Sequence, residues 1–300
     1  MAFLVLKIDV DTLEGTYKGV PNLVQILRKA GAGATFLFSL GPDHTGWALR
    51  RVFQRGFLKK VSYTSVLKHY GIKTLSYGIL LPGPDIGAHA ASQMCAARDS
   101  GFEVGIHAWD HVYWQDNVRT RERRWTIAQM EKSYSRFVDI FGEEPRTHGA
   151  AGWKMNECAF YQLDAWKIRY ASDGRGHSPY RLILNGLPLN HVQLPTTLPT
   201  LDEALQLNGL HTHNIVNYLL SLTQDDRVDN VFTLHAELEG RKFAPILEQL
   251  LAGWRAQGHI LVSMADYYTT LNLGLLPSHP IEWGKVSGRV GRLIIQPTKC

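Results

Sequence analysis

The chain has 300 residues, of which 45% are hydrophobic and 20% are charged. This balance is typical of a globular protein and excludes disordered, collagen-like and low-complexity chains. No uncharged apolar run reaches the roughly 18 residues of a membrane-spanning helix, and the first eleven residues lack the basic start of a secretory signal. Three cysteines without close spacing predict neither a disulfide framework nor a CxxC metal site, so we expect a cytoplasmic protein.

Short apolar runs alternate with segments of helical spacing. In chain order we predict a strand at 3–8, a helix at 20–27, strands at 34–40 and 102–106, a helix at 127–141, strands at 168–171, 192–194 and 231–234, helices at 213–222 and 243–256, and a strand at 259–262. This alternation predicts an α/β fold with a parallel sheet or barrel. We expect one barrel over 1–272, interrupted by an insertion at about 44–92, and a surface tail over 273–300. No Walker or GxGxxG loop supports nucleotide binding.

The net charge of +5 has a local origin. Between Asp43 and Asp85 lie seven basic residues and no acidic one. Within this segment, residues 47–61 have the spacing of an amphipathic helix, which predicts binding to an anionic membrane surface. The expected membrane-binding side chains are Arg50, Arg51, Phe53, Arg55, Phe57, Lys59 and Lys60. The alternative is an ordinary helix packed on the barrel. Nucleic acid is a less favoured partner, because no known binding module is similar.

Two pairs of polar residues follow predicted strands, where functional groups of parallel α/β folds gather. Asp9 and Asp11 share a face at the end of the first strand, so one could bind a cation while the other acts as a base. His107 and His111 have the i, i+4 spacing of one helical turn, which suits a zinc-like ion. The alternatives are a solvated turn and two ordinary polar histidines.

Two further candidates follow later strands. His235 ends the apolar run at 231–234, and Asp173 and Arg175 lie in a glycine-rich loop. A single histidine there is often structural, and the loop by itself is an ordinary turn. The three residues are therefore weaker indications of function than the aspartate and histidine pairs.

Together these motifs resemble the polysaccharide deacetylase (NodB-homology) family of metal-dependent amidohydrolases. IDVD at 8–11 is similar to the family's TFDD motif, HAWDH at 107–111 to HSxxH, and LHA at 234–236 to LxH, while GAAGW at 149–153 stands where RxPxG is usual. The resemblance implies a distorted (β/α)7-type barrel. It also implies one role for each matching residue: Asp9 as catalytic base, Asp11, His107 and His111 as metal ligands, and His235 as general acid.

Longer sequence segments resemble one group of proteins within this family. IDVDTLEGTYKGVP, FSLGPD, EVGIHAWDH, SDGRG, QLPTTLPT and LHAELEG are similar to members that remove the formyl group from undecaprenyl-phosphate-linked 4-deoxy-4-formamido-L-arabinose. This implies a deformylase of the lipid A aminoarabinose pathway, which confers polymyxin resistance, at the cytoplasmic face of the inner membrane. The ligand set fits zinc first, with manganese, cobalt, nickel or iron as alternatives.

The departures from the family motifs also matter. His148 stands in place of the third-motif arginine that orients the base, so we expect Lys154 or Arg175 to supply a cation. The fourth motif keeps Asp173 without its usual tryptophan, and Trp153 is expected near the acyl group. Two alternatives remain open: a polysaccharide N-deacetylase, and a non-catalytic barrel that binds membranes. The retained aspartates and histidines argue against the second.

Overall fold

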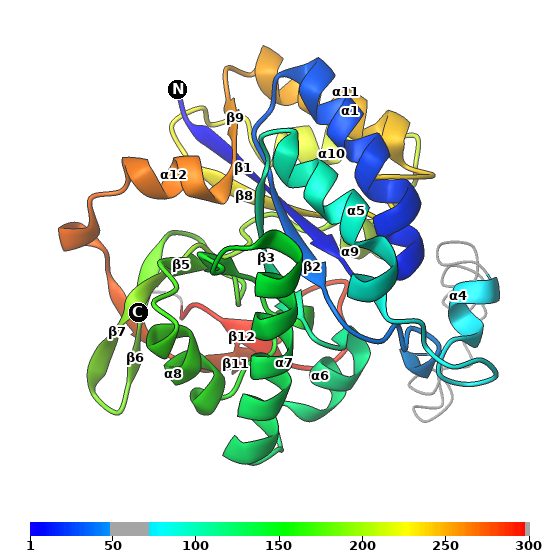
Figure 1. The fold of residues 1–300 in the computed structure, drawn as a ribbon. Coiled ribbons are helices and arrows are strands. Elements are labelled where there is room, and N and C mark those ends of the chain that lie inside the picture. The colour runs from blue at the N-terminus through cyan, green and yellow to red at the C-terminus, as the bar shows by residue number, and fades with distance from the viewer. Residues whose placement is uncertain (49–71, 298–300) are drawn as a thin grey trace.

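The computed structural model describes residues 1–48 and 72–297 (Figure 1). Its strands are β1 (Phe3–Val10), β2 (Thr35–Ser39), β3 (Glu103–Ala108), β4 (Thr147–His148), β5 (Tyr170–Ala171), β6 (Tyr180–Leu184), β7 (Leu187–Gln193), β8 (Asn230–His235), β9 (Ile260–Val262), β10 (Ser278–Pro280), β11 (Glu282–Gly284) and β12 (Leu293–Ile295).

The helices in the same ranges are α1 (Val20–Ala30), α4 (Ile72–Ser76), α5 (Ile86–Asp99), α6 (His111–Asn117), α7 (Arg123–Phe141), α8 (Glu157–Ala165), α9 (Leu201–Ala204), α10 (Ile215–Ser221), α11 (Ala244–Ala256) and α12 (Met264–Thr270). Three short turns complete the elements: a π-helical turn η1 (Gly15–Gly19) and the 3₁₀ turns η2 (Ala151–Trp153) and η3 (Leu273–Leu275).

One largely parallel sheet carries the fold. Its strands follow the order β10, β6, β7, β5, β4, β3, β2, β1, β8, and β9 pairs with the first residues of β1. Among the described residues no strand pairing joins β7 to β8. At this seam the loop residues Thr197 and Leu198 instead donate hydrogen bonds to the Val231 carbonyl. The expected barrel is distorted at this seam, where strand pairing is interrupted. The predicted α/β class with parallel strands is confirmed.

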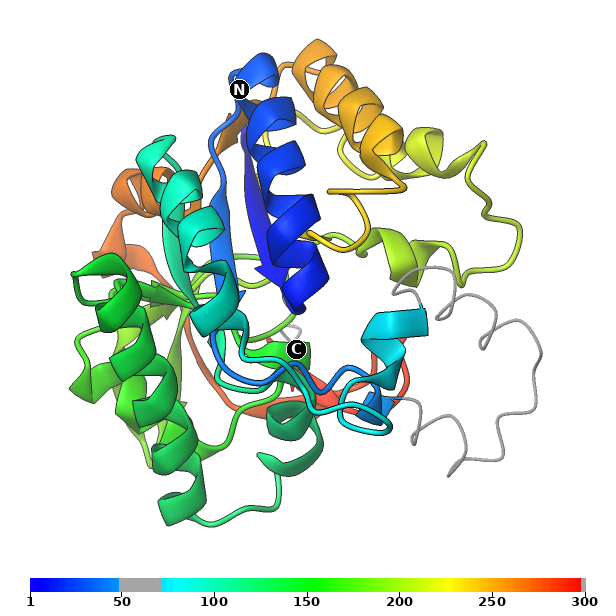
Figure 2. The ribbon, with the colours of Figure 1, turned by 45° about the vertical axis from the view of Figure 1, so that its right-hand side comes forward.

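Helices cover the outer face of the sheet. Helices α10, α11, α1, α5, α7 and α8 follow one another around it, each packed on the next, and Figure 2 shows α11, α1, α5 and α7 side by side. The alternation along β1 explains this layering. Leu4, Leu6, Ile8 and Val10 belong to the main apolar core beneath the helices, so the residues between them point to the interior of the barrel.

Most predicted elements are confirmed within a few residues, but some were missed. Helices α5, α8 and α12 and strand β6 had no counterpart in the prediction, and the strand predicted at 192–194 covers only the end of β7. The expected tail adds β10 to the edge of the main sheet and forms the two-stranded β11–β12 sheet. In the part of the chain that is described, no helix combines the length and the apolar character needed to cross a membrane.

Candidate active site

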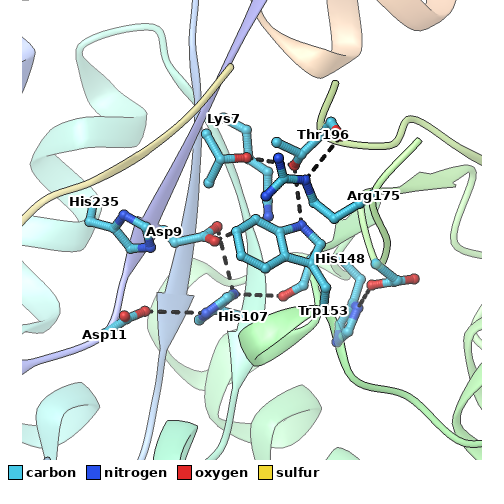
Figure 3. A network of polar contacts seen from close by, with 12 residues as sticks. Lys7, Asp9, Asp11, His107, His148, Trp153, Arg175, Thr196 and His235 are labelled. Atoms are coloured by element: carbon cyan, nitrogen blue, oxygen red, sulfur yellow. Dashed lines mark hydrogen bonds and ion pairs between the residues drawn. The ribbon is translucent and has the colours of Figure 1, made fainter. Parts of the chain in front are cut away.

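Strand β1 delivers three charged side chains to the carboxyl end of the sheet. Lys7 and Asp9 alternate with the apolar core residues of this strand, Asp11 follows its last residue, and all three are buried. Asp9 is in register with Leu37 of β2 on one side and with His235 of β8 on the other. The site therefore lies where neighbouring parallel strands end, as expected for this fold class. Figure 3 shows Asp9, Asp11, His107 and His235 converging there.

Asp11, His107 and His111 form a compact cluster. The Asp11 Oδ1 atom lies 3.2 Å from His107 Nε2, and Oδ2 lies 3.5 Å from His111 Nε2. One possible ligand atom from each of the three residues lies within 4.8 Å of the others. The predicted helical turn is wrong, however: His107 lies in β3, and His111 is the first residue of α6. Asp110 caps that helix by accepting a hydrogen bond from the Tyr113 amide.

The donor set fits a divalent metal ion. Asp11 Oδ1 and His107 Nε2 are buried and have no hydrogen-bond partner among the described residues. The His107 Nδ1–H donates to the Gly149 carbonyl at 2.6 Å, which leaves the Nε2 lone pair directed at Asp11. Burial opposes both charges. Even so, His111 and His107 lower the pKa of Asp11, and Asp9 and Asp11 raise the pKa of His107. A cation bound among these atoms would take the place of the proton on the His107 imidazolium.

Glu237 holds the end of β1 in place. Its Oε1 atom accepts hydrogen bonds from the Asp11 amide, the Thr12 amide and the Thr12 hydroxyl, at 2.9–3.0 Å. Gly15, at the start of η1, leaves room for this carboxyl group, since a Cβ there would lie 2.0 Å from Glu237 Oε1. Burial, with Asp11 nearby, raises the pKa of Glu237 to about 8. Glu237 is therefore a positioning residue for Asp11.

The cation beside Asp9 is Lys7, which no sequence motif had marked. Lys7 Nζ lies 3.1 Å from Asp9 Oδ2, and its side chain is 0% exposed. The expected candidates are used elsewhere. Arg175 makes two hydrogen bonds to the Glu203 carboxylate, at 2.7 and 2.8 Å, and Lys154 Nζ donates to the Gln115 carbonyl. The period-two alternation of β1 was the available signal, because Lys7 and Asp9 share a face.

Trp153 forms one wall of the site. It adopts a positive φ of 53°, its ring is 1% exposed, and its Nε1–H donates to the Thr196 hydroxyl at 3.1 Å. The cationic groups of Lys7 and Arg175 lie 5.1 and 5.0 Å from the ring centroid, within cation–π range. The tryptophan thus packs against the same lysine that contacts Asp9 (Figure 3).

His148 and Asp173 form a pair beside the site. His148 Nδ1 lies 2.6 Å from Asp173 Oδ1, and Gln193 donates to Asp173 Oδ2 at 3.0 Å. Burial opposes the charge on Asp173, but His148 lowers the pKa of this carboxyl group. The imidazole that replaces the third-motif arginine is therefore paired with the residue retained from the fourth motif.

His235 faces the aspartates from β8. Its amide donates to Glu239 Oε2 at 2.9 Å, and its Nδ1 lies 3.9 Å from Asp202 Oδ1. Burial disfavours the imidazolium, but Asp202, Asp11 and Asp9 outweigh it and raise the pKa of His235 to about 9. Asp202 comes from α9, far along the chain, and no sequence motif marks it.

These groups line one cavity of about 200 Å³. Its walls include Asp9, Asp11, His111, Trp153, Asp202 and His235. The structure therefore brings the predicted base, ligands and acid together, with Trp153 beside them. The predicted membrane-binding residues, Arg50 to Lys60, lie outside the described residues.

Comparisons with known proteins identify named relatives of this chain. No family model matches the chain. A protein of Shewanella sediminis named probable 4-deoxy-4-formamido-L-arabinose-phosphoundecaprenol deformylase ArnD is 33% identical over 278 residues, which are 93% of this chain and 87% of the relative. A protein of Wigglesworthia glossinidia brevipalpis with the same name is 30% identical, over 94% of this chain and 98% of the relative.

Solved structures show the same fold. A protein of Mycobacterium smegmatis named as a polysaccharide deacetylase matches with a TM-score of 0.65 at 14% identity, over 95% of each chain. The Puue allantoinase matches with a TM-score of 0.59, also at 14% identity, over 89% of each chain. The expected resemblance to polysaccharide deacetylases is thus confirmed for the fold. With the identity and coverage of the curated relatives, the chain belongs to the family of 4-deoxy-4-formamido-L-arabinose-phosphoundecaprenol deformylases.

Proposed function

We propose that this protein is a metal-dependent deformylase. Its substrate would be 4-deoxy-4-formamido-L-arabinose linked to undecaprenyl phosphate, and its product the free amine used to modify lipid A. One observation carries the proposal: the Asp11, His107 and His111 cluster shares a cavity with a carboxylate and an imidazole suited to acid–base chemistry. The identity of the acyl group and of the sugar is taken from the activity for which the relatives are named.

Asp11, His107 and His111 would hold the metal ion, with zinc as the first expectation and manganese, cobalt, nickel or iron as alternatives. A divalent ion there supplies a Lewis acid for the formyl oxygen and a lower pKa for a water molecule. The protein's own contribution is the fixed orientation of these ligands. Gly149 sets the tautomer of His107, and Glu237 fixes the backbone of Asp11.

Asp9 would act as the general base. Its Oδ2 atom is held by Lys7, whereas the buried Oδ1 atom has no hydrogen-bond partner in the described ranges and can accept the proton of the attacking water. The water oxygen then forms a bond to the formyl carbon. Lys7 keeps the carboxylate oriented and compensates its buried charge, the role that we had expected of Lys154 or Arg175.

His235 would act as the general acid. An amide nitrogen leaves only after it gains a proton, and the carboxylates around His235 keep its imidazole protonated near neutral pH. As the carbon–nitrogen bond breaks, His235 gives this proton to the sugar amine, and the former formyl group leaves as formate. One water and one formamide thus give one formate and one protonated amine.

The alternative of a polysaccharide N-deacetylase is less well supported. Relatives of 30–33% identity bear a deformylase name, whereas the deacetylase match has 14% identity and concerns the fold. We further propose that the protein works at the cytoplasmic face of the inner membrane, where a substrate with a polyprenyl tail would be anchored. Docking by the basic segment around Arg51, Arg55 and Lys59 remains part of this proposal.

Formate release from a synthetic short-chain phosphoprenyl formamido sugar tests the function. We expect turnover by the metal-loaded protein and loss of it after chelation, with recovery when zinc or manganese is restored. Asp9→Asn and His235→Ala should each lower kcat by about 10²- to 10⁴-fold while metal content stays unchanged. Hydrolysis of an N-acetyl polysaccharide, with no formate released from the sugar lipid, would favour the deacetylase instead.

A further inference from the structure

Arg289 lines the active-site cavity from the far end of the chain. Arg289 follows β11 and lies in a tight turn, where its amide donates to the Val286 carbonyl at 3.2 Å. The turn packs closely on α9, since Gly288 has φ of +78° and a Cβ there would lie 2.5 Å from the Glu203 carbonyl oxygen. The backbone thus fixes where this guanidinium enters the cavity.

Arg289 and Arg175 share one carboxylate but differ in how their donors are used. Arg175 makes two hydrogen bonds to Glu203 and donates to the Thr196 and Leu198 carbonyls. Arg289 Nε lies 3.3 Å from Glu203 Oε1, whereas its Nη1 atom is buried without a hydrogen-bond partner within the described residues. The hydrogen-bond donors of Arg175 are therefore used within the protein, whereas Arg289 retains donors for a ligand.

The surroundings of Arg289 favour a planar, bidentate contact. Its guanidinium carbon lies 4.2 Å from the centroid of the Trp153 ring, and its side chain is 21% exposed. Stacking of this kind restricts the guanidinium plane, and such a fork matches the oxygens of a phosphate. The nearby carboxylate of Asp202 already faces His235 and accepts a hydrogen bond from the Thr200 hydroxyl at 2.6 Å.

We propose that Arg289 binds the phosphate group of the substrate and so sets the specificity of this site for a phosphate-linked sugar. The inference rests on the proposed function, because the same cavity must hold the formamido group at Asp9 and His235. A phosphodiester carries one negative charge on two free oxygens, which can accept two parallel hydrogen bonds from N–H groups at one edge of the guanidinium. A neutral glycoside has no such acceptor.

The experiment compares two substrates, each assayed without lipid, so that the only phosphate is the substrate's own. One is the formamido sugar joined through phosphate to a short prenol, and the other is its phosphate-free methyl glycoside. Arg289→Gln should lower the kcat/KM ratio between the two by about 10- to 100-fold, chiefly through KM for the phosphate substrate. The same ratio for Arg289→Lys, which keeps a point charge, should lie between those of wild type and Arg289→Gln. Arg292→Gln, at an exposed arginine of the same tail, is the matched control and should leave the ratio unchanged.

Binding gives a second readout that needs no turnover. Calorimetric titration with 4-amino-4-deoxy-arabinose 1-phosphate and with the free amino sugar should show a loss of affinity in Arg289→Gln for the phosphate compound alone. If wild type cleaves neither substrate but binds the phosphate compound through Arg289, the proposed function fails and the phosphate site stands. An equal fall on both substrates and both ligands, or no change on any of them, would overturn the phosphate site.

Discussion

Replacing Lys7 by methionine tests the most unusual feature of the site, a fully buried lysine beside Asp9, the proposed base. The pair is 3.1 Å apart and its side chains are 0% and 5% exposed, so solvent does little to screen it. Removing one partner of a buried ion pair typically costs about 3–5 kcal/mol, because the other charge stays buried without compensation. We expect Lys7→Met to lose stability in this range and to lower kcat at least about 100-fold, since Asp9 is no longer held.

Urea unfolding and formate release measure the two effects. Lys18→Met is the matched control, because Lys18 pairs with Glu14 at 2.9 Å but is 65% exposed, and an exposed pair contributes at most about 1 kcal/mol. Lys7→Arg should keep part of the activity, since it restores a cation of the kind used in the wider family.

The double variant Lys7→Met/Asp9→Asn separates charge from packing. With both charges removed, most of the lost stability should return, although activity should not. If Lys7→Met proves as stable and as active as Lys18→Met, the ion pair with Lys7 does not hold Asp9 in position. If the double variant is no more stable than Lys7→Met, the loss comes from packing instead.

Three further predictions concern the metal, the backbone beneath it and the acyl group. Asp11→Ala should abolish stoichiometric metal binding in an elemental analysis while the circular dichroism spectrum stays native; full metal content would place the ion elsewhere. Gly15→Ala should weaken metal affinity by about 10- to 100-fold, because its Cβ displaces Glu237, whereas Gly274→Ala in open surroundings should not; equal affinities would refute the positioning role. An acetamido analogue should react more slowly by about 10- to 200-fold, since one added carbon must fit beside Trp153, and equal rates would contradict a formyl-sized pocket.

The fold and much of the site followed from local patterns. Alternation of apolar runs with helical spacing predicted the parallel sheet, and the ends of those runs at Asp9, His107 and His235 marked the edge where the side chains meet. Such predictions succeed because strand ends of a parallel sheet share one edge. Helix α5 was missed because its spacing gives only a weak apolar stripe, IGAHAASQMCAARD, rich in small residues.

Site residues that lie far along the chain from these motifs could not be predicted from the sequence. Asp202 and Arg289 reach the cavity, and Glu203 reaches Arg175 and Arg289, only because α9 and the C-terminal turn pack together there. Lys7 was different, since its position two residues before Asp9 already placed it on the interior face. It was overlooked because a lysine inside an apolar strand suggests an exposed edge, whereas here a carboxylate compensates its buried charge.

The proposed acid role of His235 leads to a final prediction, on pH dependence. An acid must be protonated to work, so kcat should fall on the alkaline side as His235 loses its proton. The pKa of His235 is raised to about 9 largely by Asp202, 3.9 Å away, and a bound cation near Asp11 would lower it from there. Removing the Asp202 charge in Asp202→Asn destabilises the imidazolium further, so the alkaline fall should begin at lower pH than in wild type. Ser221→Ala, at the exposed end of α10, should leave the profile in place. Profiles of kcat at saturating substrate decide the matter, and an alkaline limb that does not move in Asp202→Asn would show that the titrating acid is not His235.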